Sequence, residues 1–225
     1  MESVREVLAG NRYPGRGVLW GRGLDGGVYG VYFLTGRSAA SRARGLRLGG
    51  GELVVSPTDT TAHDPLRHYA AARQEGRWLT YGNGEQVAVV AERLRGGAEP
   101  GPALQGLEYE PDPPIFTPRI TVVADRESGE AWFGAARRSR GGRESTDVLT
   151  LRVGELAPGD AVLMTTYRSD GETVATAEPY HEVAVTVRGK EELLAEVWGA
   201  LTPELRVAIA VFESGKLADA VLRHA

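Results

Sequence analysis

The sequence predicts an α+β fold with largely antiparallel sheets. About ten segments have the pattern of strands and follow one another as hairpins, whereas only three or four segments have the pattern of helices. A parallel sheet would require strands and helices to alternate along the chain, and they do not. No internal repeat and no linker divides the sequence, so we predict a single domain over residues 1–225.

The first half of the chain is expected to begin with a short amphipathic helix over residues 1–12 and to continue as two hairpins. The expected strand pairs, each joined by a glycine-rich turn, are residues 18–20 with 28–34 and residues 46–48 with 52–55. A Gly-x-Gly-x-x-Gly pattern at residues 21–26 falls in the first turn, without the following helix that dinucleotide binding requires. Asp64 and Pro65 indicate the start of a short helix over residues 66–74.

Strands dominate the second half as well. The expected strands are residues 77–81, 120–123, 131–135, 147–153, 161–167, 181–187 and 206–212. Residues 86–94 are apolar and fit a strand that turns into a helix, and residues 190–201 carry the apolar stripe of an amphipathic helix. Residues 96–102 are expected to be a flexible break. Residues 107–114 are expected to be irregular, because this segment contains three prolines, which lack backbone donors.

Composition excludes several classes of function. The chain has no cysteine, so disulfides, zinc–thiolate sites and cysteine nucleophiles are excluded. The formal net charge of −4 argues against general nucleic-acid binding. No signal peptide and no long apolar stretch is present, so we expect a cytoplasmic protein without a membrane span. His63 and His68 are spaced unlike metal ligands, and no metal site is predicted.

The densest cluster of chemistry-bearing side chains lies at residues 36–44, directly after an apolar strand. The cluster contains no acid, and its arginines and serines are Arg37, Ser38, Ser41, Arg42 and Arg44. The planar guanidinium matches the geometry of phosphate, and serine hydroxyls add donors at short range. The same composition fits a solvated loop, so the residues alone leave an anion site and a solvated loop open.

Further polar residues stand at expected loop tips beside strands. These residues are Arg16, Tyr69, Asn83, Gly84, Glu110, Thr117 and Arg119. If the hairpins stack, several tips could meet, and a glutamate buried beneath the proline-rich loop could act as a base with a raised pKa. Each residue also has an ordinary interpretation as a packed tyrosine, a turn or a solvated acid.

The order of these segments resembles the archaeal-type IMP cyclohydrolase family and its bacterial relatives. The segments that carry the resemblance are Tyr13-Pro14-Gly15-Arg16, residues 37–42, Tyr69 ahead of Asn83-Gly84, Glu108-Tyr109-Glu110 with Thr117-Pro118-Arg119, and Thr165-Thr166-Tyr167. The resemblance covers nearly the whole chain. It implies a four-layer αββα sandwich of antiparallel sheets, like that of the N-terminal-nucleophile hydrolases. It does not imply their chemistry, because residue 2 is a glutamate.

The resemblance also implies a reaction in purine biosynthesis, the closure of a formamido-imidazole-carboxamide ribotide to IMP with loss of water. By position, Arg42 and Tyr69 would stabilise or protonate the formyl oxygen, and Glu110 would accept the amide proton. The implied substrate-binding residues are Arg16, Arg37, Ser38, Asn83, Gly84, Thr117 and Arg119. Arg44 is expected to be solvated. The implied partner is a small purine ribotide, the protein is expected to form a homo-oligomer, and no metal or cofactor is required.

Two departures from the family pattern leave a second function open. Val87 and Ala88 stand where the family usually has Thr-Asp, and Ala43 stands where bacterial relatives often have asparagine. A protein of the same fold that binds a purine nucleotide or ribotide without catalysis, or an enzyme acting on a related ribotide, would also fit these changes. A turnover assay with the formylated ribotide distinguishes the cyclohydrolase from these alternatives.

Overall fold

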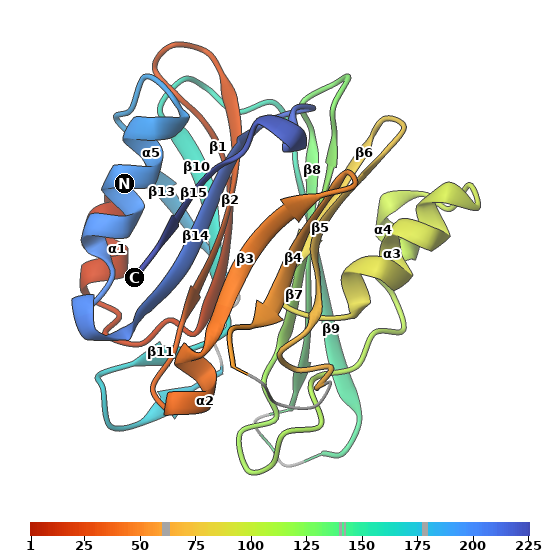
Figure 1. Ribbon diagram of the computed structural model, residues 1–225. Coiled ribbons are helices and arrows are strands. Elements are labelled where there is room, and N and C mark those ends of the chain that lie inside the picture. The colour runs from red at the N-terminus through yellow and green to blue at the C-terminus, as the bar shows by residue number, and fades with distance from the viewer. Residues whose placement is uncertain (60–63, 140, 142, 177–179) are drawn as a thin grey trace.

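Two antiparallel sheets face each other at the centre of the structure (Figure 1). It is a computed structural model that describes residues 1–59, 64–139, 141, 143–176 and 180–225. One sheet has six strands and the other has seven, and a separate pair of very short strands lies outside both. All pairings between the strands of these sheets are antiparallel, which confirms the predicted α+β class.

The two sheets are built from different parts of the chain. Across the six-stranded sheet the order is β13 (His181–Ala184), β10 (Asp160–Thr165), β1 (Arg16–Arg22), β2 (Val28–Thr35), β14 (Arg206–Glu213) and β15 (Val221–His224). The seven-stranded sheet follows chain order: β3 (Arg44–Gly49), β4 (Glu52–Pro57), β5 (Tyr69–Glu75), β6 (Trp78–Gly82), β7 (Arg119–Asp125), β8 (Ala131–Arg138) and β9 (Thr146–Val153). The short pair is β11 (Arg168–Ser169) with β12 (Val174–Ala175).

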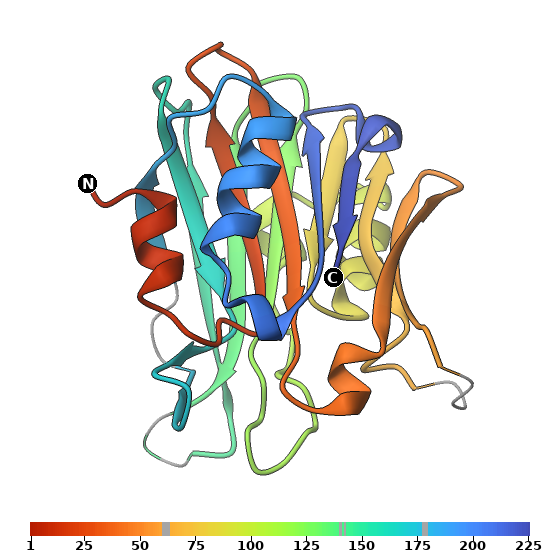
Figure 2. The ribbon, with the colours of Figure 1, turned by 60° about the vertical axis from the view of Figure 1, so that its left-hand side comes forward.

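Helices cover the outer face of each sheet. Figure 2 shows α1 (Val4–Ala9) and α5 (Lys190–Ala200) side by side on the six-stranded sheet. On the other side of the molecule, α3 (Gln86–Arg95) and α4 (Pro100–Ala103) cover the seven-stranded sheet. The one-turn helix α2 (Ala39–Arg42) joins β2 to β3, and two 3₁₀ turns occupy Pro203–Leu205 and Leu217–Asp219. No described helix has the length and apolar character that a membrane span requires.

Strand β2 illustrates why both faces of a sheet are apolar. Because successive side chains of a strand point to opposite faces, Tyr32 and Leu34 join the apolar cluster between the two sheets, while Val31 and Phe33 pack beneath α1 and α5. All four side chains are fully buried. The strand therefore has an apolar residue at almost every position, without the alternation of a strand that has one solvated face.

Most predicted elements are confirmed. They include the N-terminal helix, both early hairpins, the helix beginning at Lys190 and the strand beginning at Arg206. The ambiguous segment 86–94 is helix α3. The polar cluster at 36–44 contains the short helix α2, and the short helix α4 begins within residues 96–102, which were expected to be a flexible break. The sequence did not predict β11, β12 or β15.

The predicted helix over residues 66–74 is wrong. Asp64 does cap a turn, since its Oδ1 accepts from Leu66 N at 2.9 Å and its carbonyl accepts from His68 N at 2.8 Å. The chain then extends from Tyr69 as β5, which pairs with β4 and β6. Pairing on both sides overrides the helical preference of its three alanines. Tyr69 is therefore presented from a strand.

Candidate active site

A cavity of about 630 Å³ is lined in part by the α2 segment. Figure 1 shows α2 at one end of the two sheets, at the bottom of the view. Segments far apart in the sequence meet at the cavity: the start of β1, the α2 segment, the turn before β5, the loop before β7 and the segment after β10. The residues that line it are Tyr13, Arg16, Arg37, Ser38, Ala40, Ser41, Arg44, Asp64, Leu66, Arg67, Glu110, Asp112, Ile115 and Tyr167. The lining is rich in arginine, as an anion site requires.

Gly15 allows β1 to begin directly against the segment after β10. Its φ of +71° is in the left-handed region, and a Cβ there would lie 2.3 Å from Thr166 Oγ1. Arg16 N donates to the same oxygen at 3.1 Å, and Thr166 N donates to Arg16 O at 2.9 Å. This close approach anchors the backbone from which Arg16 reaches the cavity.

Arg16 and Glu110 form a buried ion pair at the cavity. Arg16 Nη2 donates to Glu110 Oε1, and the two residues are only 9% and 3% exposed. Burial raises the pKa of Glu110 above its ordinary value, and the charge of Arg16 opposes that shift. Glu110 Oε2 has no hydrogen-bond partner among the described residues. A carboxylate with a raised pKa and a free oxygen is suited to accept a proton.

Asn83 holds the carboxylate of Glu110 in position from outside the cavity lining. Its Nδ2 donates to Glu110 Oε1 at 3.1 Å and to Pro118 O at 2.9 Å, and its Oδ1 accepts from Ile120 N at 2.7 Å. Gln86 Nε2 donates to the same Oδ1 at 3.2 Å. Asn83 is fully buried and does not line the cavity, so its hydrogen bonds hold the carboxylate in place.

A second network fixes the loop that carries Glu110. Thr117 donates to Asp112 through its backbone N at 2.6 Å and through its hydroxyl at 2.5 Å, and Glu110 N donates to Thr117 O at 2.8 Å. Thr117 Oγ1 also contacts the hydroxyl of Tyr167. Burial raises the pKa of Tyr167 to about 12, so its hydroxyl stays protonated at neutral pH.

An aromatic stack forms another part of the wall. The rings of Tyr13 and Tyr167 stack with centroids 5.5 Å apart, and the Arg37 guanidinium lies 4.6 Å from the centroid of Tyr13. Arg37 is exposed at the mouth of the cavity. A flat, cationic group over an aromatic face is a common arrangement at sites that bind planar or anionic ligands.

Two buried tyrosines, Tyr32 and Tyr69, are hydrogen-bonded to each other near the cavity. The hydroxyls of Tyr32 on β2 and Tyr69 on β5 are 2.7 Å apart. Burial raises the pKa of both phenols, and the positive charges of Arg16 and Arg44 act against that shift. Tyr69 is 5% exposed and is not among the lining residues, so it lies behind the cavity wall.

The chain matches the family described as IMP cyclohydrolase-like protein over residues 13–216. It belongs to this family. The IMP cyclohydrolase of Methanopyrus kandleri is 29% identical over 159 residues, which cover 69% of this chain and 75% of that protein. The IMP cyclohydrolase of Thermococcus kodakarensis is 28% identical over 210 residues, which cover 91% of this chain and 94% of that protein. The family resemblance seen in the sequence is thereby confirmed.

Within this IMP cyclohydrolase-like chain, the structure brings most predicted site residues to one place. Arg16, Arg37, Ser38 and Glu110 line the cavity. Tyr69, Asn83 and Thr117 are buried behind it, and a Cβ at Gly84 would lie 3.7 Å from Glu110 Oε1. Glu85, beside Gly84, pairs with Arg119 at 2.8 Å, and Arg119 does not line the cavity.

Arg42 at the end of α2 and Arg44 at the start of β3 differ from the sequence-based expectation in opposite ways. Arg42 is exposed and does not line the cavity, and its side chain makes no hydrogen bond or ion pair among the described residues. Its predicted catalytic role therefore has no geometric support. The expectation that Arg44 is solvated is wrong, since Arg44 is only 6% exposed and lines the cavity. Arg42 ends α2 with its side chain exposed, and Arg44 begins β3 with its side chain buried at the cavity.

Among the residues of the wall that were not predicted from the sequence are Arg67 and Asp64. They come from the turn before β5, which was predicted as a helix and not as part of the site. Tyr167 was noted only as part of a family segment. No local pattern distinguishes these residues, because the topology alone brings them to the cavity.

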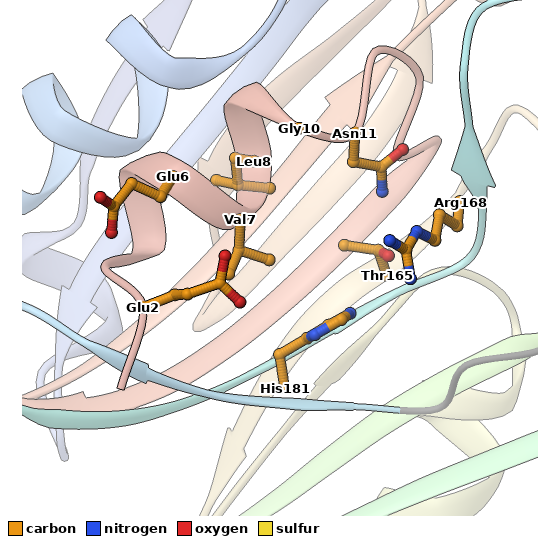
Figure 3. Close-up of a pocket in the computed structure, with 9 residues that line it drawn as sticks. All are labelled: Glu2, Glu6, Val7, Leu8, Gly10, Asn11, Thr165, Arg168 and His181. Carbon is orange, nitrogen blue, oxygen red and sulfur yellow. The ribbon is translucent and has the colours of Figure 1, made fainter.

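A smaller cavity of about 100 Å³ lies beside α1 (Figure 3). The side chains of Glu2, His181 and Arg168 border it, and Asn11 connects it to the larger site by donating to Tyr167 O at 2.8 Å. None of the predicted site residues lines it. Within the described part of the chain, no three histidine, aspartate or glutamate side chains group as metal ligands.

Proposed function

We propose that this protein is an IMP cyclohydrolase, which closes the ring of 5-formamidoimidazole-4-carboxamide ribotide to give IMP and water in purine biosynthesis. The observation that carries the proposal is the buried Arg16–Glu110 pair beside an arginine-lined cavity, in a chain that matches the family over residues 13–216. Two proteins similar to this chain over most of their length carry the name IMP cyclohydrolase.

The reaction needs a base and a stabilised oxyanion. The carboxamide nitrogen attacks the formyl carbon and loses a proton, and the formyl oxygen becomes negatively charged. Loss of that oxygen as water requires two protons. One is the carboxamide proton, returned by the base, and the other comes from a proton donor, which is restored when the formamide nitrogen gives up its proton and the C–N double bond of the ring forms. An amide nitrogen is a weak nucleophile, so holding it against the formyl carbon supplies part of the acceleration.

Glu110 is the proposed base, because its raised pKa and its unpartnered Oε2 allow it to take the amide proton. Arg16 is held by the same carboxylate and supplies positive charge where the oxyanion develops. Tyr69 is the proposed proton donor to the leaving oxygen. It is buried beside Tyr32 and does not line the cavity, so in this proposal its proton reaches the substrate oxygen through one water molecule.

The remaining predicted residues bind or position the substrate in this proposal. Arg37 and Ser38 stand at the mouth of the cavity and contact the base edge or the phosphate. Asn83, Gly84 and Thr117 hold the base in place through hydrogen bonds and close packing. Arg119 contributes positive charge near Glu110 rather than a direct contact. Arg42 keeps its predicted role only as a hypothesis for mutagenesis.

The experiment that tests the proposal follows absorbance as purified protein is mixed with the formylated ribotide. The expected result is formation of IMP by the wild-type protein and its loss in Glu110→Gln. A folded wild-type protein that leaves the ribotide unchanged would refute the proposed activity. Calorimetric titration with IMP on the same sample shows whether the cavity still binds a purine ribotide.

One observation favours a second candidate, a ribotide-binding protein without this activity or an enzyme on a related ribotide. Val87 and Ala88 replace the polar pair expected in the family, and Val87 is fully buried at the start of α3. Micromolar binding of IMP without any turnover would favour the binding protein. Turnover of another formylated ribotide, with none of this one, would favour the related enzyme.

We also propose the finer architecture and the assembly that the resemblance implies. Two facing sheets with helices on their outer faces support a four-layer αββα sandwich of the N-terminal-nucleophile-hydrolase type. Superposition on solved structures of that type tests this assignment. A homo-oligomer is proposed as well, and light scattering of the purified protein measures it. The cytoplasmic location stays a prediction from the sequence.

A further inference from the structure

Arg44 is a buried cation without a carboxylate partner. It is 6% exposed, and none of the ion pairs among the described residues includes it. Its hydrogen bonds go only to backbone carbonyls: Nε donates to Ser41 O at 2.8 Å, and Nη2 donates to Thr35 O at 3.3 Å. Burial of a charge without a counter-charge is costly, so such a residue is expected where a ligand supplies the opposite charge.

The other arginines of the cavity differ from Arg44. Arg16 is neutralised by Glu110, and Arg67 pairs with Asp59 at 2.7 Å. Arg37 is exposed and lies over the ring of Tyr13, so water solvates its charge. Among the described arginines that line the cavity, Arg44 alone is both buried and without a carboxylate.

The guanidinium of Arg44 is also held in a fixed orientation. The chain turns tightly between β2 and β3, and a Cβ at Gly36 would lie 2.8 Å from the backbone of Ser41. Thr35 and Ser41, which stand on either side of this turn, provide the two carbonyls that hold the side chain. Its Nη1 has no hydrogen-bond partner among the described residues. A guanidinium fixed before binding loses little freedom when it meets an anion.

The acids near the cavity do not compete for Arg44. Glu110 is occupied by Arg16 and Asn83, and Asp112 accepts two hydrogen bonds from Thr117. Asp64 Oδ1 accepts from Leu66 N. The open donor of Arg44 therefore remains for a ligand.

We infer that Arg44 binds the phosphate of the ribotide and determines the preference of the site for a phosphorylated ligand. This inference rests on the proposed function, since it assigns Arg44 to the phosphate and the Arg16–Glu110 pair to the reacting ring. It also explains why an arginine occupies a buried position where the carbonyls of Thr35 and Ser41 only partly satisfy its donors. A guanidinium meets a phosphate dianion through two parallel hydrogen bonds.

The test compares IMP with inosine, which lacks the phosphate. Calorimetric dissociation constants are measured for the wild-type protein and for Arg44→Gln, whose amide can still donate to a carbonyl. The preference for IMP over inosine is expected to fall by about 10- to 100-fold in Arg44→Gln, as the loss of a charge-assisted contact predicts. Inosine binding should stay within about threefold of wild type, because inosine makes no contact with Arg44 in this arrangement.

Two further variants sharpen the comparison. Arg44→Lys keeps the charge without the planar fork, so its preference should be intermediate, about 3- to 10-fold below wild type. Arg47→Gln, an exposed arginine on the same strand, should keep the wild-type ratio. If Arg44→Gln does not fold, as circular dichroism would show, Arg44→Lys decides the question.

The outcomes separate this inference from the proposed function. An unchanged ratio in folded Arg44→Gln or Arg44→Lys, or an equal loss of IMP and inosine, would overturn the assignment of Arg44. Ring closure by the wild-type protein would leave the proposed function standing in that case. Wild-type protein that neither closes the ring nor binds IMP would refute the function and the inference together.

Discussion

Replacement of Glu110 by glutamine removes the charge of the proposed base while keeping its shape. Both hydrogen bonds of the carboxylate, from Arg16 Nη2 and from Asn83 Nδ2, reach the same oxygen, Oε1. The amide oxygen of glutamine can accept both, and the amide nitrogen takes the place of Oε2. The variant therefore tests the base without disrupting the loop that carries it.

The expected magnitude follows from these contacts. A general base contributes about 10²- to 10⁴-fold to a rate, so kcat for ring closure should fall by about that factor while KM changes little. Arg16 stays hydrogen-bonded but loses its counter-charge, which should lower the free energy of unfolding by up to about 3 kcal/mol. Urea denaturation measures this loss and shows whether the variant is folded at the temperature of the assay.

The pH profile gives a second, independent readout. Burial raises the pKa of Glu110 above 4.5, and the base must be deprotonated to act. Wild-type kcat/KM should therefore fall as pH falls through this raised pKa, and the residual activity of Glu110→Gln should lack that acidic limb. Turnover within about threefold of wild type in the folded variant, with the same acidic limb, would refute the assignment of Glu110 as the base.

Three further substitutions test the roles of two side chains, Tyr69 and Arg42, and the backbone turn at Gly15 that precedes Arg16. Tyr69→Phe should lower kcat by about 100-fold or more with IMP affinity retained, measured by the absorbance assay and calorimetry; normal kcat would exclude Tyr69 as the proton donor. Arg42→Ala should keep activity within about threefold because its side chain is exposed, and a larger loss would restore the role implied by the resemblance. Gly15→Ala should lower the free energy of unfolding by about 1–3 kcal/mol, since φ is +71° and Thr166 Oγ1 is too close; unchanged urea stability would contradict this.

The sequence predicts the fold well where local pattern and tertiary pairing agree. The hairpin of β1 and β2 has a glycine-rich turn between two apolar runs, and both signals describe the same structure. At β5 the local pattern and the tertiary pairing disagree. Asp64 and Pro65 are typical of a helix start, whereas the segment pairs as a strand with β4 and β6. Pairing decides that segment, and no local pattern reveals it.

The residues of the site also fall into those that the sequence predicts and those that it does not. Glu110 could be predicted because the prolines around it exclude regular structure and its position follows the family pattern. The distinction between Arg42 and Arg44 could not be predicted, because it depends on where α2 ends and β3 begins, which leaves Arg42 exposed and Arg44 buried. Arg67 reaches the wall only because β5 returns beside β4, which is a property of the sheet and not of the segment.

A crystal structure of the wild-type protein with IMP tests the central claim most directly. We predict IMP in the cavity beside α2, with its purine ring at Glu110 and Arg16 and its phosphate at Arg44. IMP bound outside this cavity, for example in the smaller one bordered by Glu2 and His181, would contradict the account. So would IMP bound in the reverse orientation, with its phosphate at Glu110.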